Sequence, residues 1–316
     1  NTLSVSVNNT AMPNSRWYSG SGIYRHVRLH VLPQLHIEPW GVSVTTPAVG
    51  KGSSTVHVAA QIRLPGAPRP GASAREGGLK APEDYTVRFA VTGPDGRRVV
   101  SAGAQVVANA AAFPGRPRDD PGDGPGDGAS PAAEPPAHAM AAAALTIAPA
   151  RLWSPGDPAL YALKAELVRG DEVIDSATTR FGIRSISVDR RNGLVLNDVP
   201  IKLRGGCVHH DCGILGSAAY DRAEERKVEL MKASGFNAVR CAHNPPSVAF
   251  LDACDRLGML VIDEAFDCWR DAKNPNDYSM AFADHWLEDL ESMIRRDRNH
   301  PSIIMWSTGN EIRERD

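Results

Sequence analysis

With 316 residues, 42% hydrophobic side chains and 23% charged side chains, the chain has the composition of a globular protein long enough for more than one domain. This composition excludes a fibrous protein and gives no sign of a membrane-embedded one. The formal net charge is -2, and no basic run is interleaved with aromatic residues. Nucleic acids and other polyanions are therefore not expected as partners.

The two ends of the sequence carry no start or stop signals. The chain begins at Asn1 without an initiator methionine or a leader segment, and it runs from Glu311 to Asp316 without the signs of a domain end. We expect both ends to be truncated, so the cellular compartment cannot be inferred from the sequence.

Residues 1–39 alternate between apolar and polar side chains at 3–7 and 23–32, with a turn-rich stretch at 14–22 between them. This pattern predicts two strands from the end of a β-sandwich. Residues 40–186 continue the β pattern and predict an immunoglobulin-like sandwich of about seven strands. The expected strands lie at 42–44, 55–62, 85–91, 99–107, 145–147, 160–168 and 173–181.

Two stretches interrupt the sandwich pattern, near residues 65–82 and 108–144, where alanine, glycine and proline dominate. Such segments bury too little apolar surface to offset the entropy lost on ordering, so they are predicted to be disordered inserts. The alternative is a proline-rich docking segment, although no consistent PxxP pattern supports it.

From residue 187 to residue 316 strands and helices alternate, which predicts parallel β/α units. Strands are expected at 200–208, 238–241, 259–263 and 303–307, and helices at 221–234, at 247–257 and around 286–294, with Asp221 as the first N-cap and Gly235 after that helix. A complete (β/α)₈ barrel takes about 250 residues. The region therefore predicts the N-terminal half of a TIM barrel.

Polar and aromatic side chains follow each of these four strands, and in such barrels the C-terminal strand ends form one shared pocket. Carboxylates, amides, arginine and histidine can bind sugar hydroxyls, and Trp269 or Trp306 can stack on a sugar ring. Each residue also has a structural interpretation. His209 or His210 can be a satisfied structural histidine, Arg240 can pair with Asp263 or Glu264, and Trp306 can belong to the core.

Five segments stand out by their length and order: RWYSGSGIYR at 16–25, RGGCVHHD at 204–211, NAVRCAHNP at 237–245, DEAFD at 263–267 and WSTGNE at 306–311. Together they resemble the signatures of glycoside hydrolase family 2, most closely those of its β-galactosidases. The first segment is similar to the closing strands of the family's N-terminal sugar-binding jelly roll. The resemblance implies that residues 1–39 are the C-terminal part of that domain.

The resemblance also implies roles for individual residues in a retaining β-glycosidase. Glu311 matches the general acid/base and is expected to be buried enough to stay protonated, while the nucleophile comes from a later strand beyond Asp316. This chain alone is therefore expected to be inactive. The expected substrate-binding residues are Asn310, Arg240, His243, His209, Asp211 and Trp269.

The implied activity is hydrolysis of terminal non-reducing β-D-galactosides. A β-glucuronidase or β-mannosidase of the same family remains an alternative, as does a non-catalytic carbohydrate-binding protein. A carbohydrate is the expected partner, and the resemblance leaves a homo-oligomer open.

Some family members bind magnesium beside the acid/base, through a glutamate and a histidine shortly after the third barrel strand. Here Phe266, Asp267, Cys268 and Trp269 occupy that stretch. Magnesium prefers oxygen ligands, so Cys268 is a poor replacement for a carboxylate. We therefore expect no metal and no other cofactor.

The five cysteines are odd in number, lie in the last third of the chain and lack the paired spacing of a zinc site. They are expected to be free thiols, mostly buried, with a reactive or disulfide-bonded cysteine as the alternative. They are Cys207, Cys212, Cys241, Cys254 and Cys268.

Overall fold

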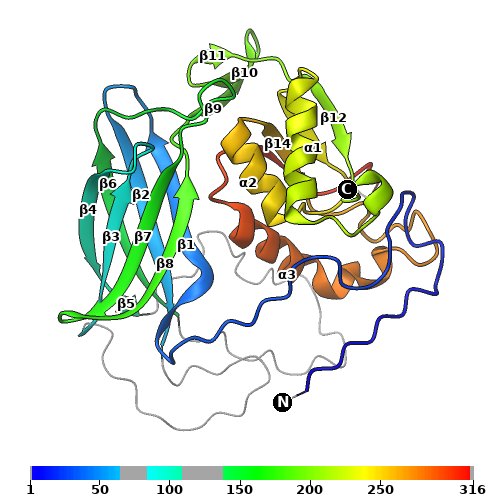
Figure 1. The fold of residues 1–316 in the computed structure, drawn as a ribbon, viewed down its shortest axis with the longest axis horizontal. Helices are drawn as coiled ribbons and strands as arrows, with labels where there is room; N and C mark the ends of the chain where they lie inside the picture. The colour runs from blue at the N-terminus through cyan, green and yellow to red at the C-terminus, as the bar shows by residue number, and fades with distance from the viewer. Residues whose placement is uncertain (1, 65–83, 109–137, 314–316) are drawn as a thin grey trace, which may run out of the picture.

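A computed structural model describes residues 2–64, 84–108 and 138–313. It contains a β-sandwich and, beside it, a parallel sheet flanked by helices (Figure 1). The predicted disordered inserts lie outside the described residues at 65–82 and 109–137. None of the described helices has the length and apolar character needed to cross a membrane.

The sandwich consists of two antiparallel four-stranded sheets, which confirms the predicted strands. In the order of pairing, the first sheet contains β1 (His36–Ala48), β2 (Ser54–Arg63), β6 (His138–Ile147) and β5 (Val107–Ala108). The second contains β4 (Arg98–Gln105), β3 (Thr86–Thr92), β7 (Tyr161–Arg169) and β8 (Glu172–Phe181). Every second residue along β3 is fully buried, because alternate side chains of a strand point to opposite faces. The two inner faces thus form one shared core.

The predicted limit of the second insert is wrong, because residues 138–144 belong to strand β6. This strand pairs with β2 along its whole length, and Ala139 and Ala141 are buried in the core. Alanine has a low intrinsic preference for strands, but pairing and burial within the sheet override that preference. Composition alone therefore placed the end of the insert too late.

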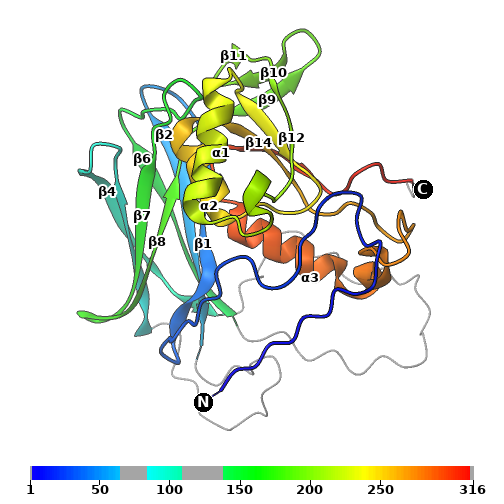
Figure 2. The same cartoon turned by 45° about the vertical axis from the view of Figure 1, so that its right-hand side comes forward.

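The predicted strands at 3–7 and 23–32 are also wrong, since the described residues 2–35 contain no strand. Their alternating apolar side chains are exposed, to 90% for Leu29. An alternating pattern reports a strand-like periodicity, but a strand forms only where a second one satisfies its backbone hydrogen bonds. Instead, the segment runs past α3 and loops beside the strand ends of the parallel sheet (Figure 2). Its assignment to a jelly roll stays a prediction.

A small antiparallel sheet connects the two parts, with β9 (Ile186–Asp189), β10 (Gly193–Leu196) and β11 (Val199–Pro200). Asn197 and Asp198 form a two-residue turn with φ of 51° and 64°, the conformation that a tight hairpin requires. The single strand predicted at 200–208 is therefore wrong, because its first residue closes this hairpin.

The parallel sheet contains four strands in chain order, as the first half of a barrel requires. They are β12 (Gly205–Val208), β13 (Ala238–Cys241), β14 (Leu260–Glu264) and β15 (Ile303–Ser307). A 3₁₀ turn, η2 (Gly213–Leu215), and three helices connect them: α1 (Asp221–Ala233), α2 (Val248–Leu257) and α3 (Ser279–Asp297).

Both ends of α2 follow their capping signals, whereas the start of α1 does not. Ser247 caps α2 by accepting a hydrogen bond from the backbone N–H of Phe250, and Gly258 ends the helix in the left-handed conformation. The N-cap of α1 is Tyr220, not Asp221 as predicted. Asp221 is instead the first helical residue, where its negative charge interacts favourably with the positive end of the helix dipole.

Buried contacts join the sandwich to the half barrel. The Trp153 indole is fully buried and donates a 2.9 Å hydrogen bond to the carbonyl of Asp255 in α2. The Arg184 guanidinium donates to the carbonyls of Pro301 and Ile303, and burial lowers the pKa of Arg184 to about 10.

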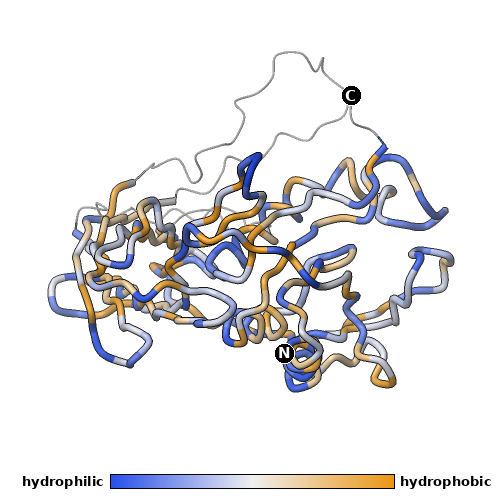
Figure 3. The backbone as a smooth tube through the Cα atoms, turned by 90° about the horizontal axis from the view of Figure 1, so that it is seen from above, coloured by the Kyte–Doolittle hydropathy of each residue, from blue (hydrophilic) through white to orange (hydrophobic). Residues whose placement is uncertain are grey.

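Apolar stretches run through both parts, with polar stretches on the outlying loops (Figure 3). All five cysteines are free, as predicted, and three of them are buried.

Candidate active site

Glu264, at the end of β14, is the centre of a polar network that joins neighbouring strands. Its fully buried carboxylate accepts hydrogen bonds of 2.9 Å from Nε of Arg240 and 2.7 Å from Oγ of Ser307. Its other oxygen lies 2.7 Å from Nδ1 of His243. A buried carboxylate needs such partners to offset its desolvation, so this network fixes the ends of β13, β14 and β15 relative to one another.

Arg240 extends the network to the last strand. Its Nη2 donates a 3.0 Å hydrogen bond to Oδ1 of Asn310, in addition to its bonds with Glu264. The structural interpretation of Arg240 thus holds, with Glu264 rather than Asp263 as its partner. The same side chain also fixes the orientation of the Asn310 amide, which the sequence predicted to contact substrate.

Asp267 forms a second centre beside the first. Its Oδ1 accepts hydrogen bonds from Asn310 (2.8 Å), Lys273 (3.1 Å) and Arg16 (3.0 Å). Burial raises the pKa of Asp267, but these hydrogen bonds and the Lys273 charge outweigh it and lower that pKa below 3.8. Asp267 is therefore ionised at neutral pH.

Glu311 lies next to this second centre. Its Oε2 is 3.2 Å from Nη1 of Arg16 and 3.8 Å from Nζ of Lys273. Its side chain is 67% exposed, and its backbone has φ of 49°. The expectation that Glu311 is buried is thus wrong in this structure. A strand end places a residue at the pocket rim, but its burial depends on which other segments cover it.

Two histidines and a tryptophan form an aromatic group at the ends of β12 and β13. The Trp17 ring stacks on His209 with ring centroids 5.2 Å apart, and it forms a T-shaped pair with His243, also with ring centroids 5.2 Å apart. Burial, followed by the nearby His243, lowers the pKa of His209, so its imidazole is neutral at pH 7. Residue patterns did not single out Trp17 as a site residue, and the motif at 16–25 was the one signal that could have found it.

A cavity of about 440 Å³ lies beside these groups. Its size is typical of small-molecule sites, and Asp267 and His243 belong both to its lining and to the polar network. The N-terminal segment, the loops after β13 and β14, and α3 form its walls. The lining residues are Asn14, Trp17, Trp40, His243, Asn244, Pro245, Ala265, Phe266, Asp267, Cys268, Asp277, Tyr278, Asp289, Ser292, Met293 and Arg296.

The structure groups most, but not all, of the predicted site residues. Arg240, Asn310 and Glu311 join the network at the cavity edge without lining the cavity itself, and His209 reaches it through Trp17. The remaining two do not line this cavity. Asp211 follows β12, whereas Trp269 lines a smaller pocket together with Glu311 and Lys273, donates to the Thr308 carbonyl (2.8 Å) and stacks on Phe282.

The residues beside Glu311 do not fit a magnesium ion. Burial, followed by the charge of Asp277, raises the pKa of Cys268 to about 11, so this buried side chain is a neutral thiol. The backbone carbonyls of Asp267 and Asn310 and Oδ1 of Asp267 already accept hydrogen bonds from the ammonium group of Lys273. Magnesium requires several oxygen ligands in octahedral geometry, and this donor set does not supply them.

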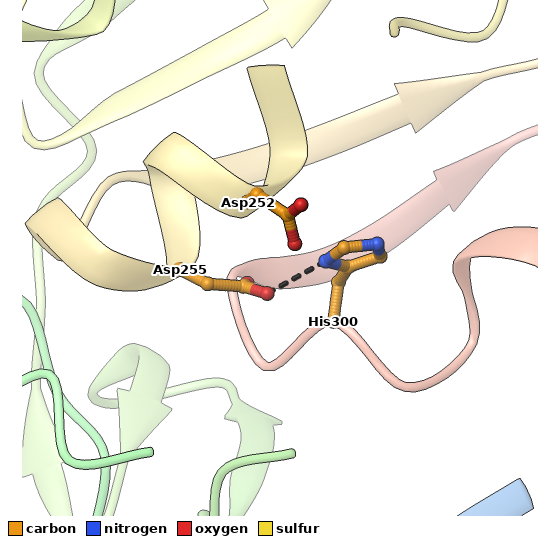
Figure 4. Close-up of side chains that lie close together, drawn as sticks. All are labelled: Asp252, Asp255 and His300. Carbon is orange, nitrogen blue, oxygen red and sulfur yellow. Dashed lines mark hydrogen bonds and ion pairs between the residues drawn. The ribbon is translucent and has the colours of Figure 1, made fainter. Parts of the chain in front are cut away.

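Elsewhere in the described residues, three side chains suited to metal binding lie together: Asp252, Asp255 and His300 (Figure 4). His300 Nδ1 is 2.6 Å from one oxygen of Asp255, and the other accepts a 3.0 Å hydrogen bond from the Ser302 backbone. Both oxygens of Asp255 therefore have protein partners. The cluster connects α2 to the start of β15, at the opposite end of the sheet from Glu311, which is typical of a stabilising role.

We expect this cluster to make stability depend on pH. Burial lowers the pKa of His300, but the charge and hydrogen bond of Asp255 outweigh it and raise that pKa above 6.5. A raised folded-state pKa gives stabilisation that is complete below the unfolded pKa and is lost as pH rises through the folded one. The melting-temperature difference between wild type and His300→Gln should therefore shrink as pH rises. His285→Gln, at an exposed position of α3, is the control, and a gap constant with pH would contradict the prediction.

Comparison with known proteins agrees with this architecture. Residues 186–316 match the family model described as "Glycosyl hydrolases family 2, TIM barrel domain", and residues 35–184 match the model "Glycosyl hydrolases family 2". The β-galactosidase BoGH2A of Bacteroides ovatus is 37% identical over 314 residues, covering 99% of this chain and 32% of that protein.

Solved structures give the same result. A glycosyl hydrolase family 2 member from Bacteroides cellulosilyticus is 41% identical with a TM-score of 0.77, covering 98% of this chain and 36% of that one. A β-glucuronidase of Bacteroides uniformis is 26% identical with a TM-score of 0.70, covering 97% and 33%. The chain thus spans about a third of the length of these relatives. Its sandwich, its half barrel and both family matches show that it belongs to glycoside hydrolase family 2.

Proposed function

We propose that this chain is the acid/base-bearing part of a retaining β-glycosidase that hydrolyses terminal non-reducing β-D-galactosides. The observation that carries the proposal is the position of Asn310 and Glu311. They follow the fourth barrel strand, within one hydrogen-bonded network with Arg240 and Asp267, beside a cavity of about 440 Å³.

In this proposal Glu311 donates a proton to the leaving oxygen and then accepts one from the attacking water. The mechanism also needs a carboxylate nucleophile about 5 Å away, which we assign to a later barrel strand outside this sequence. Closure of the pocket by the rest of the barrel would supply the burial that favours the first step.

Asn310 is the proposed ligand of the sugar hydroxyl beside the reacting carbon. Arg240 and Asp267 each use one group of its amide, and a second N–H can still donate to a hydroxyl. We assign sugar contacts as well to Arg240, His243, His209, Asp211 and Trp269, and for Asp211 and Trp269, which do not line the cavity, the assignment rests on the sequence motifs. Among these His243 lines the cavity, together with Asp267 and Trp17.

Galactose as the sugar rests on the sequence motifs and on the similarity to the β-galactosidase of Bacteroides ovatus. The rival is a β-glucuronidase, because the "Putative beta-glucuronidase" of Formosa agariphila is 34% identical over 312 residues and a solved structure of a β-glucuronidase shares the fold at 26% identity. Arg16 and Lys273 could neutralise a uronate carboxylate, but both are already paired with Asp267 and Glu311. The observed pairing therefore favours the neutral sugar.

The test uses the full-length protein that contains this chain. We expect kcat/KM for 4-nitrophenyl β-D-galactoside to exceed that for the matching β-D-glucuronide and β-D-mannoside by about 10²-fold or more, since buried polar groups discriminate hydroxyl patterns strongly. The α-D-galactoside is the control for anomeric specificity. Preference for the glucuronide would select the rival, and absence of hydrolysis of all four would support a non-catalytic carbohydrate-binding protein.

A further inference from the structure

The ammonium group of Lys273 lies among oxygens that belong to the candidate active site. Its Nζ donates to the Asp267 carbonyl at 2.6 Å, to Asp267 Oδ1 at 3.1 Å and to the Asn310 carbonyl at 2.5 Å, and it lies 3.8 Å from Oε2 of Glu311. The side chain is 10% exposed. The three protons of an ammonium group match the three accepting oxygens. The group therefore connects the segment that follows β14 to the segment that follows β15.

The backbone of Lys273 is itself held firmly. Asp277 Oδ2 accepts 2.7 Å hydrogen bonds from the backbone N–H groups of Lys273 and Asn274, and Oδ1 accepts one of 2.6 Å from the Ser279 hydroxyl. These hydrogen bonds outweigh burial and lower the pKa of Asp277, so it stays ionised. The turn before α3 thus fixes the point from which the Lys273 side chain reaches the site.

Charge explains why a cation is needed there. Asp267 and Glu311 bring two carboxylates together, and Arg16 lies between them on the solvent side, 43% exposed. Lys273 supplies the second positive charge from the protein side. Without it, the two carboxylates would repel each other and the Asn310 carbonyl would lose its donor.

We propose that Lys273 is a positioning residue that sets the geometry of Asn310 and Glu311. Its ammonium group supplies, beside the acid/base, the positive charge that a bound divalent cation would otherwise supply. This inference rests on the proposed function. It follows from the occupied oxygens around Nζ and from the neutral Cys268 thiol, which together leave no oxygen shell for magnesium. Turnover should therefore need Lys273 and not an added metal ion.

The experiment compares Lys273→Met with Lys232→Met in the full-length protein. Lys232 is a matched control, because its Nζ also donates to a backbone carbonyl, that of Gly258 at 3.2 Å, but the residue belongs to the last turn of α1. We expect Lys273→Met to lower kcat for alkyl β-D-galactosides by about 10²-fold with little change in KM, as misplacement of a catalytic group does. Lys232→Met should retain wild-type kcat, and Lys273→Arg should recover part of the loss.

A second measurement does not depend on any variant. Wild-type enzyme treated with EDTA should keep its kcat, and added Mg²⁺ should change it less than about twofold, within the scatter expected for a group outside the reaction. Loss of activity in EDTA that Mg²⁺ restores would overturn the proposal. Unchanged kcat in Lys273→Met would overturn it as well.

The two proposals fail in different ways. If Glu311→Gln loses activity on substrates with poor leaving groups while Lys273→Met does not, the proposed function is supported and the role of Lys273 is contradicted. If Glu311→Gln is as active as wild type, the acid/base assignment falls first. A larger loss in Lys232→Met than in Lys273→Met would show that the effect is one of stability alone.

Discussion

Glu311→Gln is expected to reduce kcat/KM for alkyl β-D-galactosides by about 10²- to 10⁴-fold, the usual contribution of general acid catalysis. Glutamine keeps the shape of the side chain but cannot give a proton to the leaving oxygen. Activated aryl galactosides, such as 2,4-dinitrophenyl β-D-galactoside, release a phenolate that needs no protonation. Their first step should therefore proceed at nearly the wild-type rate. Steady-state and burst kinetics on both substrate types measure the difference.

Glu229→Gln is the matched control for this experiment. Glu229 is a carboxylate on α1 that pairs with Arg222 at 2.8 Å, away from the strand ends. Its removal should leave kcat/KM unchanged for both classes of substrate, because exposed ion pairs contribute little to stability. Equal losses by Glu311→Gln on alkyl and activated substrates would contradict the proton-donor role.

Arg240→Met is expected to have the largest effect on stability, about 3–5 kcal/mol in the free energy of unfolding, because it leaves the buried charge of Glu264 without its guanidinium partner. It also removes the donor to Asn310 Oδ1. A fall in kcat/KM should therefore accompany the fall in stability. Denaturant unfolding and kinetics on the full-length protein give both quantities.

A surface arginine supplies the comparison. Arg256 pairs with Glu225 at 2.5 Å, with both side chains partly exposed, so Arg256→Met should cost about 0–1 kcal/mol. The double variant Arg240→Met with Glu264→Gln should recover part of the lost stability, because the uncompensated charge is then absent. Similar small effects of both arginine variants would show that the Glu264 network does not hold the strand ends together.

Local patterns in the sequence predicted most of the fold. Apolar runs of strand length and helix-end signals such as Ser247 and Gly258 are short-range features, and β13, β14 and β15 follow the predicted bounds within one residue. The errors arose where tertiary contacts decide. The alanines of β6 form a strand because β2 pairs with them, and residues 3–7 and 23–32 do not because no described strand pairs with them.

The candidate site was partly predictable for the same reason. Parallel strands bring their C-terminal ends to one edge, so Arg240, Asn310 and Glu311 could be grouped from sequence. The contact of Arg16 with Glu311 joins residues 295 positions apart, and no local pattern carries that information. Lys273 was missed because it lies in a loop, where a lysine is normally a solvated surface residue.

The most direct test of the central claim is product analysis of Glu311→Ala in the presence of azide. Once the acid/base is removed, the small anion can attack the glycosyl-enzyme without base assistance and so replace water. Azide should therefore accelerate turnover of an activated aryl β-D-galactoside and give β-galactosyl azide, identified by NMR. Formation of the α-azide would assign Glu311 as the nucleophile, and the absence of any glycosyl azide would contradict its place in a retaining mechanism.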